Sequence, residues 1–220
     1  LFDPVPGGVD YVELLNRGPG ILNLQNIYLG NQRNGTVGSL NKCSEDPFLI
    51  FPGEYYVLSE NSDIVEREYV VKNKQQLVAL SAMPSFPDDQ GMILLLDKQG
   101  KELDVFSYRD EYHFPLLSNR EGVSLERIDP SSLTQNPANW QSASTDAGYG
   151  TPGYLNSQYR QTDPVAGEIN ISPLTFSPDQ DGHDDQITIQ YKFPGTGYTC
   201  SIIIFDQGGR PVRYLVRNNL

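Results

Sequence analysis

The sequence is poor in several features on which whole protein classes depend, namely long apolar runs and cysteines. Its longest apolar stretches, such as 93–96 and 202–205, are about four or five residues long, whereas a membrane-spanning helix needs about 20. The two cysteines, Cys43 and Cys200, are too few for a disulfide framework, although one bridge between them is an alternative to two free thiols. We therefore expect no membrane span in this segment and no disulfide-based fold.

Histidines and basic residues are also scarce. His113 and His183 are the only histidines, and a zinc site generally takes three or four nitrogen or sulfur ligands. Lys and Arg together number 16 against 28 Asp and Glu, which gives a net charge of −12. Because non-specific nucleic-acid affinity comes largely from Lys and Arg that displace counterions from phosphates, this balance argues against nucleic acid as a partner.

Alternation of apolar and polar residues is what the sequence has in quantity, together with turn residues. With 20 Gly and 16 Pro among 220 residues, many turns and short elements are expected, and helical periodicity is nearly absent. Lys98-Gln99-Gly100-Lys101 between two apolar runs predicts a hairpin. The pattern predicts an all-β fold, as a sandwich or a barrel, with strands near 9–15, 26–30, 54–59, 76–80, 92–97, 102–108 and 122–128.

The pattern changes after Ile128. Residues 129–157 are polar around the single Trp140, which indicates extended coil crossing the first domain. Residues 159–168 contain Pro164 and Gly167 without an apolar repeat, as in a linker. Further strands are predicted near 187–193, 200–206 and 212–216, without a closing strand. We therefore predict a β-sandwich domain at 1–158, a linker at 159–168 and an incomplete β module at 169–220.

Six phrases in residues 1 to about 157 resemble the lamin tail domain family. They are DYVELLN at 10–16, PGEYYVL at 52–58, LLLD at 94–97 followed by ELD at 102–104, GVSLER at 122–127, NW at 139–140 and TPGYLNS at 151–157. The resemblance implies an immunoglobulin-like β-sandwich of the type that bacteria carry in secreted and surface proteins.

Residues 169–220 are similar to a second family, the flagellar hook-capping-type immunoglobulin-like modules near the C-termini of Bacteroidota surface proteins. The matching phrases are FSPDQDGHDD at 176–185, IFD at 204–206 and GRPVRYL at 209–215. The tryptophan-bearing strand that usually follows in that family is missing, which implies a partial immunoglobulin-like module.

The residues inside these phrases have scaffold interpretations of their own. Glu13 and Asn16 stand at a strand end, where a carboxylate and an amide can hold neighbouring backbone N–H groups. Trp140 is expected to fill a gap in the core with its indole N–H bonded to a carbonyl. In Thr151-Pro152-Gly153, proline presets one backbone angle and glycine admits a positive φ, which predicts a sharp turn.

The sharpest candidate for ligand binding is an acidic loop around Gly182. It contains Asp179, Asp181, Asp184 and Asp185, and oxygen ligands near a glycine turn are what calcium loops require. The alternative is an acidic turn in which the same carboxylates cap backbone N–H groups. We predict a weak calcium site here, and no other cofactor.

Nucleophilic catalysis needs a Ser or Cys in a Gly-framed turn with a base nearby, and the sequence offers none. Ser124 falls in a predicted strand, and Cys43 falls in a polar loop. The acidic pairs Asp88-Asp89 and Asp110-Glu111 are typical of exposed turns, although paired carboxylates also serve glycosidases. We therefore expect a chain that is not an enzyme.

The sequence thus predicts an extracytoplasmic structural, adhesion or display segment of a larger secreted or cell-surface bacterial protein. Its expected partners are proteins or cell-surface glycans. One alternative is a carbohydrate-binding module, which predicts a row of exposed tyrosines on one sheet. Another is a non-catalytic accessory domain of a secreted nuclease or phosphatase.

Overall fold

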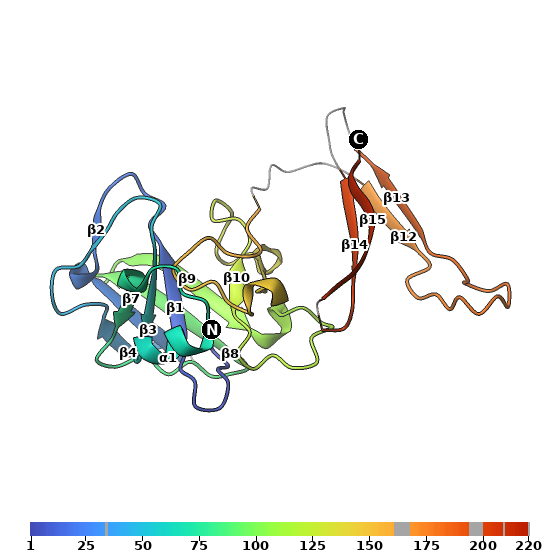
Figure 1. Ribbon diagram of the computed structural model, residues 1–220. Helices are drawn as coiled ribbons and strands as arrows, with labels where there is room; N and C mark the ends of the chain where they lie inside the picture. The colour runs from blue at the N-terminus through green and yellow to red at the C-terminus, as the bar shows by residue number, and fades with distance from the viewer. Residues whose placement is uncertain (34, 161–167, 194–199, 209, 220) are drawn as a thin grey trace. The chain divides into compact units, whose positions relative to one another are not determined.

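The computed structural model describes residues 1–33, 35–160, 168–193, 200–208 and 210–219. The fold is all-β, as predicted, with several antiparallel sheets and little helix (Figure 1). Contacts divide the chain into two compact units, Leu1–Gln161 with Phe205–Arg210, and Thr162–Ile204 with Pro211–Leu220. Most of the predicted linker at 159–168 lies outside the described residues. Among the described residues, none of the helices has the length and apolarity to cross a membrane.

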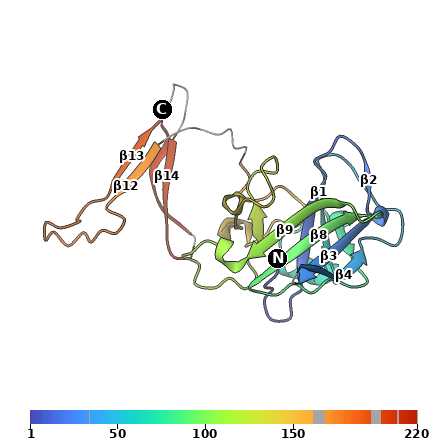
Figure 2. The ribbon, with the colours of Figure 1, turned by 180° about the vertical axis from the view of Figure 1, so that it is seen from behind.

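One layer of the first unit is a four-stranded antiparallel sheet, seen from behind in Figure 2. Its strand order is β4(Thr36–Lys42), β3(Ile27–Arg33), β8(Gln90–Asp97) and β9(Glu102–Arg109). The predicted hairpin joins β8 to β9 and is confirmed by the pairing of these two strands. Gly100 in its turn has a φ of 79°, which glycine adopts without a Cβ penalty.

The opposite layer contains a three-stranded sheet with the order β1(Tyr11–Leu15), β6(Tyr55–Ser59) and β7(Leu77–Ala79). β1 and β6 are antiparallel, whereas β6 and β7 are parallel. The parallel pair requires a crossover, and this includes α1(Ser62–Glu68), a helix that the sequence pattern did not predict. With seven residues α1 is too short to show a clear period, but Asn61 Oδ1 caps it by accepting from the main-chain N of Asp63 at 3.0 Å.

Residues 129–157 are more structured than the extended coil expected from the sequence. β10(Leu125–Arg127) pairs with β11(Trp140–Ser142), and 3₁₀ turns fill much of the remainder. A further small pair consists of β2(Leu22–Asn23) and β5(Leu49–Ile50). The 3₁₀ elements of the first unit are η1(Leu24–Asn26), η2(Lys74–Gln76), η3(Asp110–Tyr112), η4(Pro137–Asn139) and η5(Thr145–Ala147).

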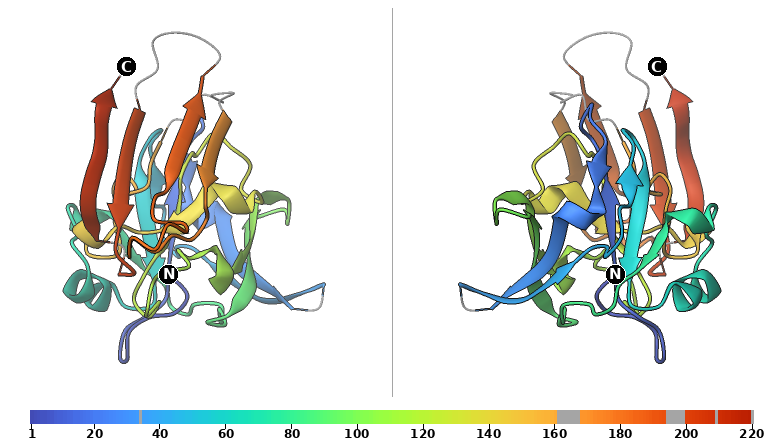
Figure 3. Two further views of the ribbon diagram at one scale, coloured as in Figure 1. Left: turned by 90° about the vertical axis from the view of Figure 1, so that its right-hand side faces the viewer. Right: turned by 90° about the vertical axis from the view of Figure 1, so that its left-hand side faces the viewer.

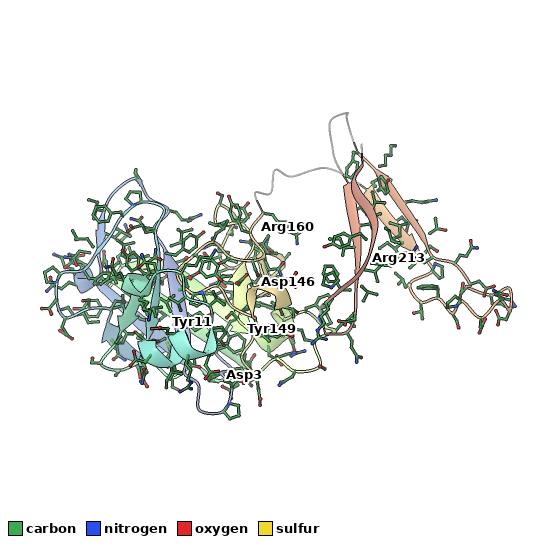
Figure 4. The ribbon with its side chains drawn as sticks, in the orientation of Figure 1. Asp3, Tyr11, Asp146, Tyr149, Arg160 and Arg213 are labelled. Carbon is green, nitrogen blue, oxygen red and sulfur yellow. The ribbon has the colours of Figure 1, made fainter. Side chains whose placement is uncertain are left out.

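The core of the first unit lies between its layers. Leu29 of β3 and Tyr108 of β9 belong to the same buried cluster as Leu58 of β6. A second buried cluster lies on the other face of the three-stranded sheet and contains Tyr11 of β1 and Val65 of α1. Figure 4 shows Tyr11 within the body of this unit. The two faces follow from strand alternation, since neighbouring residues of a strand point to opposite sides.

The scaffold predictions for Asn16 and Gly153 are confirmed, and that for Trp140 is confirmed only in its hydrogen bond. The Asn16 amide is buried; its Oδ1 accepts from the main-chain N of Gly18 at 3.0 Å, and its Nδ2 donates to the carbonyl of Ile50 at 3.1 Å. Trp140 Nε1 donates to the carbonyl of Thr134 at 2.8 Å, and the indole stacks on Phe106 with ring centroids 3.7 Å apart. Gly153 has a φ of 82°. Trp140 is only half-buried, so it covers the core rather than filling it.

Cys43 does not take part in a disulfide. Its thiol is free and fully buried within the core of the first unit. Burial raises the pKa of this thiol to about 12, so it behaves as a small apolar side chain rather than as a reactive thiolate. The alternative of a bridge to Cys200 is therefore wrong.

The second unit consists of two hairpin sheets, seen from the side in Figure 3. β12(Glu168–Ser172) pairs with β13(Thr188–Lys192), and β14(Cys200–Phe205) pairs with β15(Pro211–Asn219). None of the residues at 168–193, 202–204 and 211–216 is buried. Ile169, for example, is 67% exposed and Val212 is 64% exposed. Two-stranded sheets are marginally stable on their own, so this unit presents an apolar surface that it does not bury itself.

Candidate functional site

The acidic loop of the second unit brings three of its four candidate aspartates together. Carboxylate oxygens of Asp179, Asp181 and Asp185 lie within 4.8 Å of one another, a spacing at which they could share one metal ion. Asp184 is not part of this group. It adopts a φ of 51°, and its carbonyl accepts from the main-chain N of Ser177 at 3.0 Å.

The same carboxylates also cap the loop backbone. Asp185 accepts from the main-chain N of Gln180 at 2.6 Å and from that of Gly182 at 2.9 Å. Asp181 accepts from the main-chain N of His183 at 2.7 Å. Such capping by Asp is common in turns without any ion, so the loop geometry fits both the calcium prediction and the acidic-turn alternative.

A second group of acids, which sequence reasoning did not single out as a site, is buried in the first unit. Glu126 of β10 is 4% exposed and accepts three hydrogen bonds from the segment that follows Gly150. The donors are Thr151 Oγ1 at 2.5 Å, Ser157 Oγ at 2.7 Å and the main-chain N of Gln158 at 3.1 Å. Because both oxygens are occupied, this carboxylate fastens the segment to β10.

Glu13 of β1 holds the same segment from the other side. Its Oε2 accepts from the main-chain N of Gly153 at 2.7 Å, as expected for a carboxylate at this strand end. The pKa of Glu13 is raised to about 8, chiefly by burial; the hydrogen bond from Gly153 lowers it in part, and the nearby Glu126 adds a smaller raising effect. At neutral pH the Glu13 carboxyl is therefore mostly protonated, and it can donate a hydrogen bond as well as accept one.

The first unit also contains a partly open cavity of about 640 Å³. Leu14 of β1, Leu95 of β8 and Leu125 of β10 are among its apolar walls, and Glu13, Glu126 and Arg127 are among its polar ones. Its volume lies in the range of ligand pockets, about 300–1,000 Å³. Arg127 is held in the wall with 15% of its side chain exposed and its Nη1 3.5 Å from Asp104 Oδ2.

The candidate catalytic residues do not assemble into a reaction centre among the described residues. The hydroxyl of Ser124 is hydrogen-bonded to that of Tyr11, and both are buried. His113 is buried elsewhere, with Nδ1 2.9 Å from Ser142 Oγ. Burial lowers the pKa of His113 to about 4, so its ring is neutral at pH 7.

The acidic pairs lie at or near the surface and interact locally. Asp110 Oδ2 accepts from Arg120 Nη1 at 2.6 Å, and Glu111 beside it is exposed. Asp89 Oδ1 accepts from the main-chain N of Gln90 at 2.7 Å. These contacts are those of turn residues, and they position no second carboxylate across a cleft.

The tyrosines of the first unit do not form an exposed row. Those singled out in the sequence are buried or half-buried, and they are Tyr28, Tyr55, Tyr56, Tyr69, Tyr108, Tyr112, Tyr149 and Tyr154. Tyr154 instead lies under the Lys72 ammonium, which is 3.9 Å from the ring centroid. The described part of the first unit therefore lacks the aromatic platform on which a carbohydrate-binding module would depend.

Comparisons with known proteins leave the chain without an assigned family. No family model matches the chain, and no match was found among curated proteins or among solved structures. The resemblances to the lamin tail domain and to hook-capping-type modules therefore stay predictions.

Proposed function

We propose that this chain is a non-enzymatic structural, adhesion or display segment of a larger secreted or cell-surface bacterial protein. In this proposal residues 1–158 form an immunoglobulin-like sandwich of the lamin tail type, and residues 169–220 belong to a second immunoglobulin-like module. The all-β architecture and the phrases at 10–16 and 151–157 support it.

The observation that carries the proposal is the use of the buried ionisable groups. Glu126 spends its carboxylate on three donors of residues 151–158, and Glu13 holds Gly153. The Ser124 hydroxyl is likewise hydrogen-bonded to Tyr11, and Nδ1 of His113 to Ser142, whereas Nε2 of His113 is buried without a partner. Side chains that could carry chemistry therefore act as fasteners between segments that are distant in the sequence.

The exposed apolar side chains of the second unit also support an interaction role. This unit exposes large apolar side chains, including Ile169 at 67% and Phe176 and Tyr214 at 45% each. Exposed apolar patches mark surfaces that bind other proteins when they are contiguous. Such a surface suits a chain that adheres or assembles.

The test compares binding with turnover in one purified preparation. We expect the chain to bind to cells or cell-surface protein fractions while it fails to hydrolyse general phosphomonoester, phosphodiester and glycoside substrates in the presence of Ca²⁺ or Mg²⁺. Saturable hydrolysis that is lost on substitution of a residue of this chain would refute the proposal. Selective binding on a glycan array would favour the carbohydrate-binding alternative instead.

A further inference from the structure

An exposed apolar surface lies on the small β2–β5 pair, at one end of the first unit (Figure 1). Leu22 pairs with Ile50, which is only 1% exposed. Leu49 and Phe51, the chain neighbours of Ile50, are each 47% exposed, and Ile21 beside Leu22 is 55% exposed. Because successive residues of a strand point to opposite faces, the side chains of Ile21, Leu49 and Phe51 lie on the outward face of the pair. We call these three residues the apolar ridge.

The apolar ridge is separate from the cavity of the first unit. Leu22 and Ile50, on the opposite face of the β2–β5 pair, are among the residues that line this cavity. Among the described residues, the cavity lining does not include Ile21, Leu49 or Phe51. A chain segment or another molecule that fills the cavity therefore leaves the apolar ridge exposed.

Asn16, which is 3% exposed, holds the loops on both sides of the apolar ridge. Its Oδ1 accepts from the main-chain N of Gly18 at 3.0 Å, and its Nδ2 donates to the carbonyls of Gly20 at 2.8 Å and Ile50 at 3.1 Å. The Asn16 carbonyl accepts from the main-chain N of Gly53 at 2.8 Å. One buried residue thus fixes the chain that enters β2 and the chain that leaves β5.

Glu54 fixes the main chain of Phe51 directly. Its Oε2 accepts from the main-chain N of Phe51 at 2.8 Å and from the hydroxyl of Tyr56 at 3.1 Å. Apolar side chains on a main chain that is already ordered lose less conformational entropy when a partner binds. The apolar ridge is therefore pre-organised for contact with another molecule.

Acidic side chains border the apolar ridge. Residues 44–54 contain Glu45, Asp46 and Glu54 and neither Lys nor Arg. Glu45 has 75% of its side chain exposed, and Asp46 is exposed as well. Lys42 Nζ lies 3.4 Å from Glu45 Oε2, so it balances one of the three negative charges. The excess stays negative, and the complement of such a rim is a surface with Lys or Arg.

We propose that the apolar ridge binds a partner protein at an apolar pocket whose rim carries Lys or Arg. The inference rests on the proposed function, because it names one contact surface of an adhesion or display segment. Three half-exposed side chains cover far less than the roughly 800 Å² per partner of a standard interface, so the contact is a weak one.

The charge of the rim and the size of the apolar ridge argue against two other occupants. An anionic membrane attracts Lys and Arg, whereas Arg17, at the start of the loop before Ile21, donates to the carbonyl of Pro130. A second copy of the chain would bring the same acidic rim into contact with the first, and the area of the apolar ridge is too small to offset that repulsion.

The first experiment selects ligands for the full 220-residue chain from a phage-displayed library of random dodecapeptides. We expect enriched peptides with apolar residues and more Lys and Arg than Asp and Glu. They should bind about tenfold or more weakly to the double variant Ile21→Ser/Phe51→Ser. Leu116→Ser/Leu133→Ser removes two other exposed leucines and should leave the affinity within about twofold. No enrichment, acidic peptides, or equal affinity for both double variants would overturn the proposal.

The second experiment tests the acidic rim with the selected peptides. Glu45→Gln/Asp46→Asn keeps the shape of both side chains but removes their charge, and should weaken binding about threefold or more at low salt and less at high salt. Glu111→Gln/Glu121→Gln removes two other exposed charges and is the matched control. Equal affinities for these two variants would overturn the proposal. This comparison also decides the question if Ile21→Ser/Phe51→Ser fails to fold.

Two further measurements test the other occupants. Vesicles of phosphatidylcholine and phosphatidylglycerol in equal parts should not bind the chain through the apolar ridge, and sedimentation should show no self-association that depends on it. Vesicle binding or self-association that is lost in Ile21→Ser/Phe51→Ser would overturn the proposal in favour of a membrane or of a second copy. Hydrolytic activity, in contrast, would refute the proposed function without touching the peptide result.

Discussion

Glu13 in β1 and Gly153, 140 residues later in the chain, are joined by a hydrogen bond of 2.7 Å from the main-chain N of Gly153 to Glu13 Oε2. The bond ties the first strand to the segment that leaves the first unit. On the other side of the same segment, Glu126 accepts from Thr151, Ser157 and Gln158. The two carboxyl groups therefore hold residues 151–158 in place, and the stability of the unit should depend on their protonation and on their presence.

The first prediction concerns the pH dependence contributed by Glu13. Burial raises its pKa from 4.5 to about 8, so the folded state holds the proton more tightly than the unfolded state. Its contribution to stability is complete below pH 4.5 and is lost as the pH rises to about 8. Glu13→Gln cannot ionise and keeps an acceptor for Gly153, so its free energy of unfolding should fall less between pH 5 and pH 9.

Urea denaturation of both proteins at pH 5, 7 and 9 measures this difference, which should reach a few kcal/mol. Parallel stability profiles for the wild type and Glu13→Gln would contradict the prediction.

The second prediction concerns acid destabilisation by His113. Burial lowers its pKa from 6.5 to about 4, so its contribution to stability is present above pH 6.5 and is lost as the pH falls to about 4. His113→Phe should therefore lose less stability than the wild type as the pH falls from 6.5 to about 4. It should also cost about 1 kcal/mol at pH 7 because the hydrogen bond to Ser142 is lost. If this assignment were wrong, the melting temperature would change with pH between pH 4 and pH 7 equally steeply in the wild type and in His113→Phe.

The third prediction concerns the fastening of residues 151–158. Glu126→Ala leaves the donors of Thr151, Ser157 and Gln158 without their acceptor in a buried site, and should cost about 3 kcal/mol or more. Glu126→Gln retains one oxygen and should cost about half as much. The exposed Glu121 supplies the control, because Glu121→Ala should stay within about 0.5 kcal/mol of the wild type. Similar values for Glu126→Ala and Glu121→Ala in chemical denaturation would refute the role of Glu126.

The fourth prediction tests calcium in the acidic loop. If the loop binds Ca²⁺ weakly, millimolar Ca²⁺ raises the melting temperature and gives a titration heat, in the affinity range of about 10⁻⁴–10⁻³ M of extracellular modules. Asp181→Asn should abolish both effects. Asp184→Asn is the matched control, because Asp184 lies outside the three-carboxylate group and asparagine tolerates its positive φ. No heat on Ca²⁺ addition, together with no effect of EDTA, would leave the loop as a capped acidic turn.

The sequence predicted local structure correctly, but it did not predict the elements that form only through packing against distant segments. The strand pattern and the turn at Gly100 were predictable because alternation and turn chemistry act over a few residues. The helix α1 escaped because its seven residues bury only Val65. β11 escaped because its three residues pair with β10 across a polar segment that has no alternation of its own.

The candidate sites divide in the same way. The acidic loop was visible because Asp179, Asp181 and Asp185 are neighbours in the chain, whereas the separation of Asp184 from them depends on its backbone angle. The junction of Glu13 with Gly153, and the cavity beside β1, had no local signal. They arise where segments more than a hundred residues apart meet.

By itself, then, the sequence determined that this protein is built of strands, that it is acidic, and which of its turns are sharp, because these properties reside in single residues and their near neighbours. Only the tertiary structure decided that Cys43 is a buried free thiol, that Glu126 holds residues 151–158 in place, and that β1 and β10 line one cavity. The physical reason is that burial and hydrogen-bond partnership are set by the packing of distant segments, which no local pattern of residues encodes.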